Sequence, residues 1–386
     1  MTAEHTPDRD SADRDSADRG GTVDAGQWPP RYPIVNALGE LHNPNATAEH
    51  ESAASLQQTS EQLVLDPRTF ADARACGLTA VNITLGYTVG DQPPYEHTLR
   101  ELDVWDALLA AHPEHLRSVR TAADIHAAHA EGRTGVIYGF QNAVAVGHDR
   151  THVAERVRLF AERGVRIVQL TYNQANQLGD GSMAPENRGL SDLGRETVEA
   201  LNDQRLMVDL SHSGETTCLE AARTSRQPVS INHTGCRALT DLPRNKTDEE
   251  LRLVARRGGF VGIYFMPFLH PDGQATAEDV VAHIRHAVDV CGEDAVGIGT
   301  DGPVTPIDDL DAYRTQLAAH VAERAKAGVG AAGERADTYP FVIDLRGVDQ
   351  FRKLARLLEQ AGYREERIAK IMGGNFIAYA ERIWPA

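Results

Sequence analysis

Short apolar runs recur along most of the chain, separated by amphipathic stretches. Eight runs of four to six residues are rich in Val, Ile and Leu, and are apolar at successive positions rather than alternate ones. Such runs are typical of parallel strands that helices cover, whereas strands with one wet face alternate. The expected strands are residues 33–38, 80–85, 135–140, 167–171, 206–210, 229–232, 259–264 and 295–299.

Helical periodicity fills the intervals between these runs. Residues 151–163 place Val153 and Phe160 on one face, and a glycine follows the stretch. Residues 247–257 begin with the capping residue Thr247, carry acids in the first turn and end in two arginines. Further helices are expected at residues 191–202, 215–224 and 276–291.

The alternation of eight strands with helices predicts a (β/α)₈ TIM barrel, an α/β fold. Residues 309–386 read as extra C-terminal helices packed on it. A doubly wound open sheet is the alternative, but no Gly-x-Gly-x-x-Gly follows the first expected strand to support a dinucleotide site.

The N-terminal residues differ from the rest in composition. Residues 1–31 hold seven acids, four arginines and little apolar material, which predicts a disordered acidic tail. Residues 32–386 are then expected to form the barrel domain.

Charge and cysteine content narrow the function classes. The formal net charge is −17, which argues against nucleic acid or an anionic membrane as the main partner. No apolar run is long enough to span a membrane, and the start lacks a secretory signal pattern, so a cytoplasmic location is expected. The four cysteines form no Cys-x-x-Cys pair and are expected to be small buried residues.

Polar residues collect where the expected strands end, which is where TIM barrels carry their chemistry. His212 and His233 follow two neighbouring strands, and Asp301 follows the last one. Neutral imidazoles are common zinc ligands, and a carboxylate across the mouth can take a proton from a reacting water. One such histidine is more often a satisfied core residue, so the prediction depends on the shared position of all three.

Several segments resemble the membrane (renal) dipeptidase family, metallopeptidases of the amidohydrolase superfamily. They are GLSDLGRETVEALN, MVDLSHSGETT, PVSINHTGCRAL, LPRNKTDEELRLVARRGGFVGIYF, VGIGTDG and MGGNFIAYAERIW. The resemblance implies a (β/α)₈ barrel, a dipeptide or related carboxylate-bearing amide as substrate, and a homodimer. It implies that His212 and His233 bind the second of two metals, that Asp301 is the acid/base residue and that Arg244 holds the substrate carboxylate.

The chain departs from the family pattern at the other metal positions. The family's first histidine and aspartate fall on Leu38 and Glu40, and its bridging glutamate falls on Gln141. A shifted alignment would use His42 instead. The family's substrate-polarising histidine falls on Tyr172, a candidate catalytic residue here.

Two further strand-end residues, Asn173 and Tyr264, are expected to bind substrate. Like the other candidates, both lie where an expected strand ends.

Charge decides what metal content to expect. Two zinc ions bring four positive charges, and Glu40 alone supplies one negative charge at the ligand positions. The four lysines, Lys246, Lys326, Lys353 and Lys370, do not lie at strand ends, so a carboxylated lysine bridge is not expected. One divalent metal, zinc or manganese, on His212 and His233 with Glu40 or Asp301 and Gln141 nearby is the first expectation, and no metal is the second.

Three functions remain open. The first is a dipeptidase-like metallohydrolase with a reduced site. The second is a repurposed barrel enzyme in which His212, His233, Asp301 and Tyr172 do acid/base work without hydrolysing an amide. The third is a non-catalytic binding protein on the same fold.

Overall fold

The computed structural model describes residues 29–46, 63–147, 150–271 and 273–385, so nearly all of the predicted acidic tail lies outside the described residues. Eight parallel strands follow one another in the order β1-β2-β4-β5-β6-β7-β8-β9, and β3 pairs with β4 off this path. The strands are β1 (Ile34–Gly39), β2 (Leu78–Thr84), β3 (Leu116–Ser118), β4 (Thr134–Phe140), β5 (Val165–Gln169), β6 (Met207–Asp209), β7 (Ser230–Thr234), β8 (Phe260–Ile263) and β9 (Val296–Ile298).

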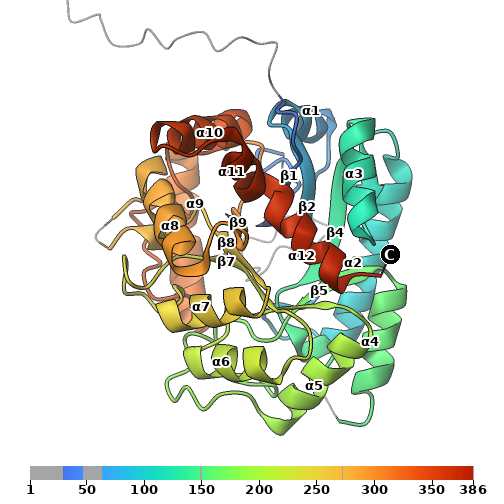
Figure 1. The fold of residues 1–386 in the computed structure, drawn as a ribbon. Coiled ribbons are helices and arrows are strands. Elements are labelled where there is room, and N and C mark those ends of the chain that lie inside the picture. The colour runs from blue at the N-terminus through green and yellow to red at the C-terminus, as the bar shows by residue number, and fades with distance from the viewer. Residues whose placement is uncertain (1–28, 47–62, 148–149, 272, 386) are drawn as a thin grey trace, which may run out of the picture.

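Helices surround the strands (Figure 1). They are α1 (Pro67–Ala75), α2 (Pro94–Ala111), α3 (Ala122–Glu131), α4 (Val153–Glu162), α5 (Asp192–Asp203), α6 (Glu215–Thr224), α7 (Asp248–Arg256), α8 (Ala277–Cys291), α9 (Leu310–Lys326), α10 (Gln350–Gln360), α11 (Glu365–Ala369) and α12 (Asn375–Ile383). Within the described ranges no helix is both long and apolar enough to cross a membrane.

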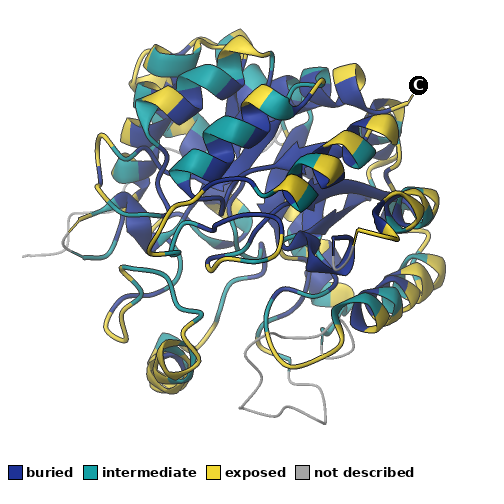
Figure 2. Cartoon of the chain, turned by 90° about the horizontal axis from the view of Figure 1, so that it is seen from below, coloured by how far each residue is buried: buried dark blue, intermediate teal, exposed yellow. Residues whose placement is uncertain are grey.

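The expected (β/α)₈ barrel is confirmed, and all eight expected strands are present within a few residues of their predicted bounds. The strand β3 was missed because its three residues, Leu116–Ser118, carry no apolar periodicity. Figure 2 shows why the other strands are apolar throughout: they are buried, while the helices expose their outer faces. Of the cysteines, three are buried as expected and Cys291 is only half-buried.

The first and last strands close the barrel through side chains as well as backbone. Asn36 on β1 donates from Nδ2 to Thr300 Oγ1 (2.8 Å), and its Oδ1 accepts from the Thr300 N–H (2.8 Å). The Asp301 N–H donates to Leu38 O (2.9 Å), and the Glu40 N–H donates to Gly302 O (3.1 Å). This seam brings the end of β1 next to the residues that follow β9.

The helix α12 forms the floor of the barrel, where it runs across the strands (Figure 1). Phe376 and Trp384 pack in one buried cluster with interior residues of the strands, among them Ala37, Ile137 and Phe260. The Phe376 ring meets Phe260 edge-on at a centroid distance of 5.3 Å. The amino-terminal end of the barrel is thus filled with apolar side chains, and the opposite rim is left for polar ones.

Truncating this floor is expected to destabilise the whole domain. Phe376→Ala should lower the free energy of unfolding by about 3–5 kcal/mol, because it leaves a cavity between α12 and Phe260. Urea denaturation measures the change, and Glu381→Ala, at an exposed position of the same helix, is the matched control. Equal stability of the two variants would contradict the assignment of α12 as the floor.

Candidate functional site

Two histidines lie side by side where β6 and β7 end. The His212 and His233 rings are 4.9 Å apart between centroids and tilted by 57°. Both are buried, and neither ring nitrogen of His233 has a hydrogen-bond partner. Burial lowers the pKa of both imidazoles well below the usual value, and the neighbouring cation Arg244 lowers them further. The pair is therefore neutral at physiological pH.

The environment of His212 fixes its tautomer. Its Nδ1 donates to Asn173 Oδ1 (2.7 Å), while Asn173 Nδ2 donates to Val329 O (3.0 Å). Since the amide nitrogen is committed to Val329, the oxygen faces His212, and the lone pair of the neutral ring is left on Nε2. The Tyr172 ring stacks on the His212 ring, with 4.3 Å between the ring centroids. The structure thus brings Tyr172, Asn173, His212 and His233 together.

A buried aspartate that sequence reasoning had not assigned a role orders this pair. Asp209 Oδ1 accepts from the Ser211 N–H (3.0 Å), the Ser211 hydroxyl (2.5 Å) and the Asn232 N–H (3.0 Å). The Ser211 hydroxyl oxygen in turn accepts from the His233 N–H (3.1 Å). One carboxylate therefore links the ends of β6 and β7. A charged residue at the end of an otherwise apolar strand was the available signal.

Arg244 and Lys246 reach the same rim from the loop that follows β7. Arg244 is 2% exposed, donates from Nη1 to Ser211 O (2.6 Å) and lies over the Tyr264 ring at 5.9 Å. Lys246 is also buried, donates to Ser213 O and pairs with the buried Glu250 at 3.1 Å. The backbone on both sides of His212 is thus held by a cationic side chain.

His283 on α8 anchors the start of this loop. Its Nδ1 accepts from the Cys236 N–H (2.9 Å), and its Nε2 donates to Leu269 O (3.0 Å). These two bonds require the neutral ring, and burial lowers the pKa of His283 from 6.5 to about 4.

Asp301 occupies the position after β9 in a left-handed backbone conformation, with φ of 60°. This conformation is unfavourable for a residue with a side chain and is common at functional sites. Burial raises the pKa of Asp301 to about 7, and Arg244 opposes that rise. Burial raises the pKa of Tyr264, and among the nearby charges Arg244 lowers it while Asp301 raises it, so the carboxyl group shares its surroundings with both residues.

The remaining candidates are Glu40, Leu38 and Gln141. Half of the Glu40 side chain is exposed, and its Oε2 is 3.7 Å from Nδ1 of the buried His42. Leu38 is a buried residue of β1, and Gln141 directly follows β4. Across the described ranges, no three His, Cys, Asp or Glu side chains gather in a group that could hold a metal.

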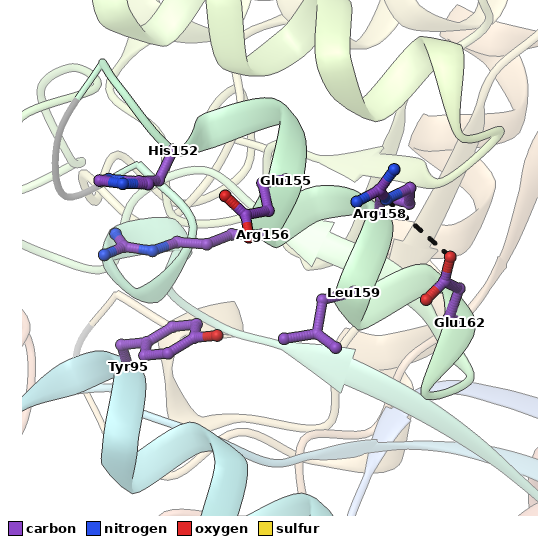
Figure 3. A pocket seen from close by; sticks show the side chains of 7 residues that line it. All are labelled: Tyr95, His152, Glu155, Arg156, Arg158, Leu159 and Glu162. Atoms are coloured by element: carbon purple, nitrogen blue, oxygen red, sulfur yellow. Dashed lines mark ion pairs between the residues drawn. The ribbon is translucent and has the colours of Figure 1, made fainter.

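A surface groove elsewhere does not belong to this rim. Figure 3 shows it between α2 and α4, where Arg156 lies over the Tyr95 ring at 4.7 Å and Arg158 pairs with Glu162. His152, at the N-cap of α4, completes one side. None of the predicted site residues lines it.

Comparison with solved structures defines the class of protein. An amidohydrolase from Pseudomonas aeruginosa superposes with a TM-score of 0.72 and 30% identity, covering 92% of this chain and 97% of that one. A metallopeptidase from Rhodobacter sphaeroides, liganded with a phosphinate mimic of the dipeptide L-Ala-D-Ala, shares the fold with a TM-score of 0.67, 22% identity and coverage of 92% and 99%. The barrel is that of an amidohydrolase.

The sequence profile of membrane dipeptidase, peptidase family M19, matches residues 73–327, and the chain belongs to this family. Dipeptidase verJ from Clonostachys rogersoniana is 29% identical over 206 residues, which are 53% of this chain and 52% of that protein. Dipeptidase tcpJ from Claviceps purpurea is 25% identical over 305 residues, 75% of this chain and 68% of that protein. The match to verJ thus spans about half of that relative.

Membership in a metallopeptidase family implies a divalent metal, and the residues present do not fit one. The predicted alignment puts Leu38 and Gln141 at ligand positions of the family, and the histidine pair has no third His, Cys, Asp or Glu beside it in the described part of the chain. Catalytic zinc sites have three protein ligands. Among the described residues, the unpartnered nitrogens of His233 are a feature that favours a metal.

Breaking the buried ion pair between Lys246 and Glu250 is expected to destabilise the protein. Lys246→Met should lower the free energy of unfolding by about 3–5 kcal/mol, because it leaves the buried Glu250 carboxylate without its counter-charge. The double variant Lys246→Met/Glu250→Met should recover much of that loss. Urea denaturation tests this, and a double variant as unstable as the single one would refute it.

Acid is expected to destabilise the protein through His283. Its folded-state pKa lies below its ordinary value, so the unfolded chain takes up the proton first as the pH falls. The free energy of unfolding should therefore drop from about pH 6.5 downward, by about 2 kcal/mol between pH 7 and pH 5 from this residue. His283→Gln, compared with the unsubstituted protein by urea denaturation at both pH values, should lack this part of the slope. An unchanged slope would contradict the assignment.

Proposed function

We propose that this chain hydrolyses an amide bond in a small, dipeptide-like substrate that carries a carboxylate, at the rim where the strands end. The observation that carries the proposal is the buried guanidinium of Arg244 on the same rim as Asp301 and the imidazole pair. The names of the relatives, dipeptidases in two fungi, support the same substrate class.

Arg244 suits the role of a carboxylate clamp. Its hydrogen bond to Ser211 O uses Nη1, and the Tyr264 ring lies against one side of the guanidinium. An arginine fork pairs with a carboxylate through two parallel N–H groups, and burial strengthens that pairing. We infer that it fixes the carboxylate end of the substrate, with Asn173 and Tyr264 beside it.

Asp301 suits the role of the base. With a pKa of about 7 it exists partly as carboxylate near neutral pH and can also return a proton. It takes a proton from water as the water oxygen bonds to the amide carbon. The carbon–nitrogen bond then breaks, and the proton passes from Asp301 to the departing amine. Tyr172 and the neutral imidazoles line the space around the reacting carbonyl.

A panel of dipeptides and N-acyl amino acids tests this function. Asp301→Asn should lower kcat by about 10²-fold or more, since it removes the base. Arg244→Lys should raise KM by about tenfold, because a lysine cannot form the paired hydrogen bonds. Arg223→Lys, an exposed arginine on α6, is the control and should match the unsubstituted protein. Absence of cleavage across the panel would end the proposal.

A second candidate is acid/base chemistry without hydrolysis on a carboxylate-bearing molecule. The observation that favours it is the neutral His212–His233 pair, one member of which has both ring nitrogens unpartnered. It is distinguished by proton exchange at carbon: substrate incubated in deuterated water would gain deuterium with its amide intact. The predicted homodimer and cytoplasmic location remain predictions.

A further inference from the structure

Three cationic side chains lie near His212, and two of them bind residues next to it in the chain. Arg244 binds the carbonyl of Ser211, and Lys246 binds the carbonyl of Ser213. Arg324, from α9, donates from Nη2 to Val329 O (3.3 Å), the same carbonyl that accepts from Asn173, the partner of His212. The carboxylates beside two of these cations, Glu250 and Glu334, are already paired with Lys246 and Arg324, so neither is free for a dication at the imidazole pair.

Arg324 is held in a fixed direction. Its Nε and Nη2 donate to the two oxygens of Glu334 (3.1 and 2.9 Å), and Nη2 also reaches Val329 O (3.3 Å). These bonds use Nε and Nη2, so Glu334 and Val329 together fix the direction of the guanidinium. Its side chain is 13% exposed, so water screens its charge only weakly.

The segment after α9 is tied to the same histidine. Asn173, which accepts the Nδ1–H of His212, donates to Val329 O, and Gln174 Nε2 donates to Gly328 O (2.7 Å). The position of Arg324 is thus coupled to the tautomer and orientation of His212.

We propose that the His212–His233 pair works without a resident divalent metal, and that Arg324 supplies the positive charge that faces the substrate's carbonyl oxygen. The inference rests on the proposed function for its second half, while its first half rests on the donor set alone. As negative charge develops on that oxygen, the fixed guanidinium stabilises it where a family member would use a metal.

Metal content and zinc binding test the first half without any substrate. The full chain, purified from cells supplied with zinc and manganese, should hold well under one metal ion per chain by mass spectrometry of the elements. In calorimetric titration with zinc, Arg324→Met should bind about tenfold more tightly than the unsubstituted chain, because a repelling charge is removed. Lys326→Met, an exposed position of the same helix, should not differ from it. Leu38→His/Gln141→Glu, which restores two donors, should bind zinc most tightly.

Activity tests the second half. Turnover of a substrate found in the dipeptide panel should survive chelator, and Arg324→Met should lower kcat by about 10²-fold with a smaller change in KM. Arg324→Lys should recover part of the loss. About one tightly bound metal per chain, or turnover that chelator abolishes and zinc restores, would overturn the inference and leave the proposed function intact. Failure of the whole panel would instead end the proposed function, while the titration would still decide the metal question.

Discussion

The closing seam between β1 and the residues after β9 is the interaction on which the rim depends. Asn36 and Thr300 exchange two hydrogen bonds across it, and Asp301 is bonded to the backbone of β1 one step further on. Parallel strands that close in this way must all end at one rim. Without the seam, the position of Asp301, which follows the last strand, would not be fixed relative to the residues of the first strand.

The barrel interior changes in character along its axis. Its floor is apolar, with Phe260, Phe376 and Ile137 in one cluster. At the end of β6, by contrast, Asp209 accepts three hydrogen bonds from Ser211 and Asn232. Buried charges such as Asp209 and Lys246 stabilise a fold only when they are fully partnered. Asp209 binds Ser211 and Lys246 binds Ser213, the two neighbours of His212 in the chain. This region therefore holds one arrangement of side chains rather than maximising apolar burial.

Much of this arrangement could be predicted from local patterns. Apolar runs located the barrel strands, the cap at Thr247 located α7, and strand-end positions selected His212 and His233. Long-range partners could not be found in this way. Arg324 lies on a helix whose described side chains are mostly exposed, and nothing local indicates that it shares the carbonyl of Val329 with Asn173. Asp209 and Lys246 were visible in sequence, but their roles depend on contacts with other loops.

The floor helix also constrains how the molecule can assemble. α12 follows all the described strands in sequence, yet it fills one end of the barrel that they form. Arg205 binds the carbonyls of Ile383 and Trp384, where this helix ends. During synthesis from the amino terminus, all nine strands emerge before the helix that fills their lower end. The apolar cluster that Phe376 and Trp384 form with the strands therefore cannot be completed until these late residues have been made.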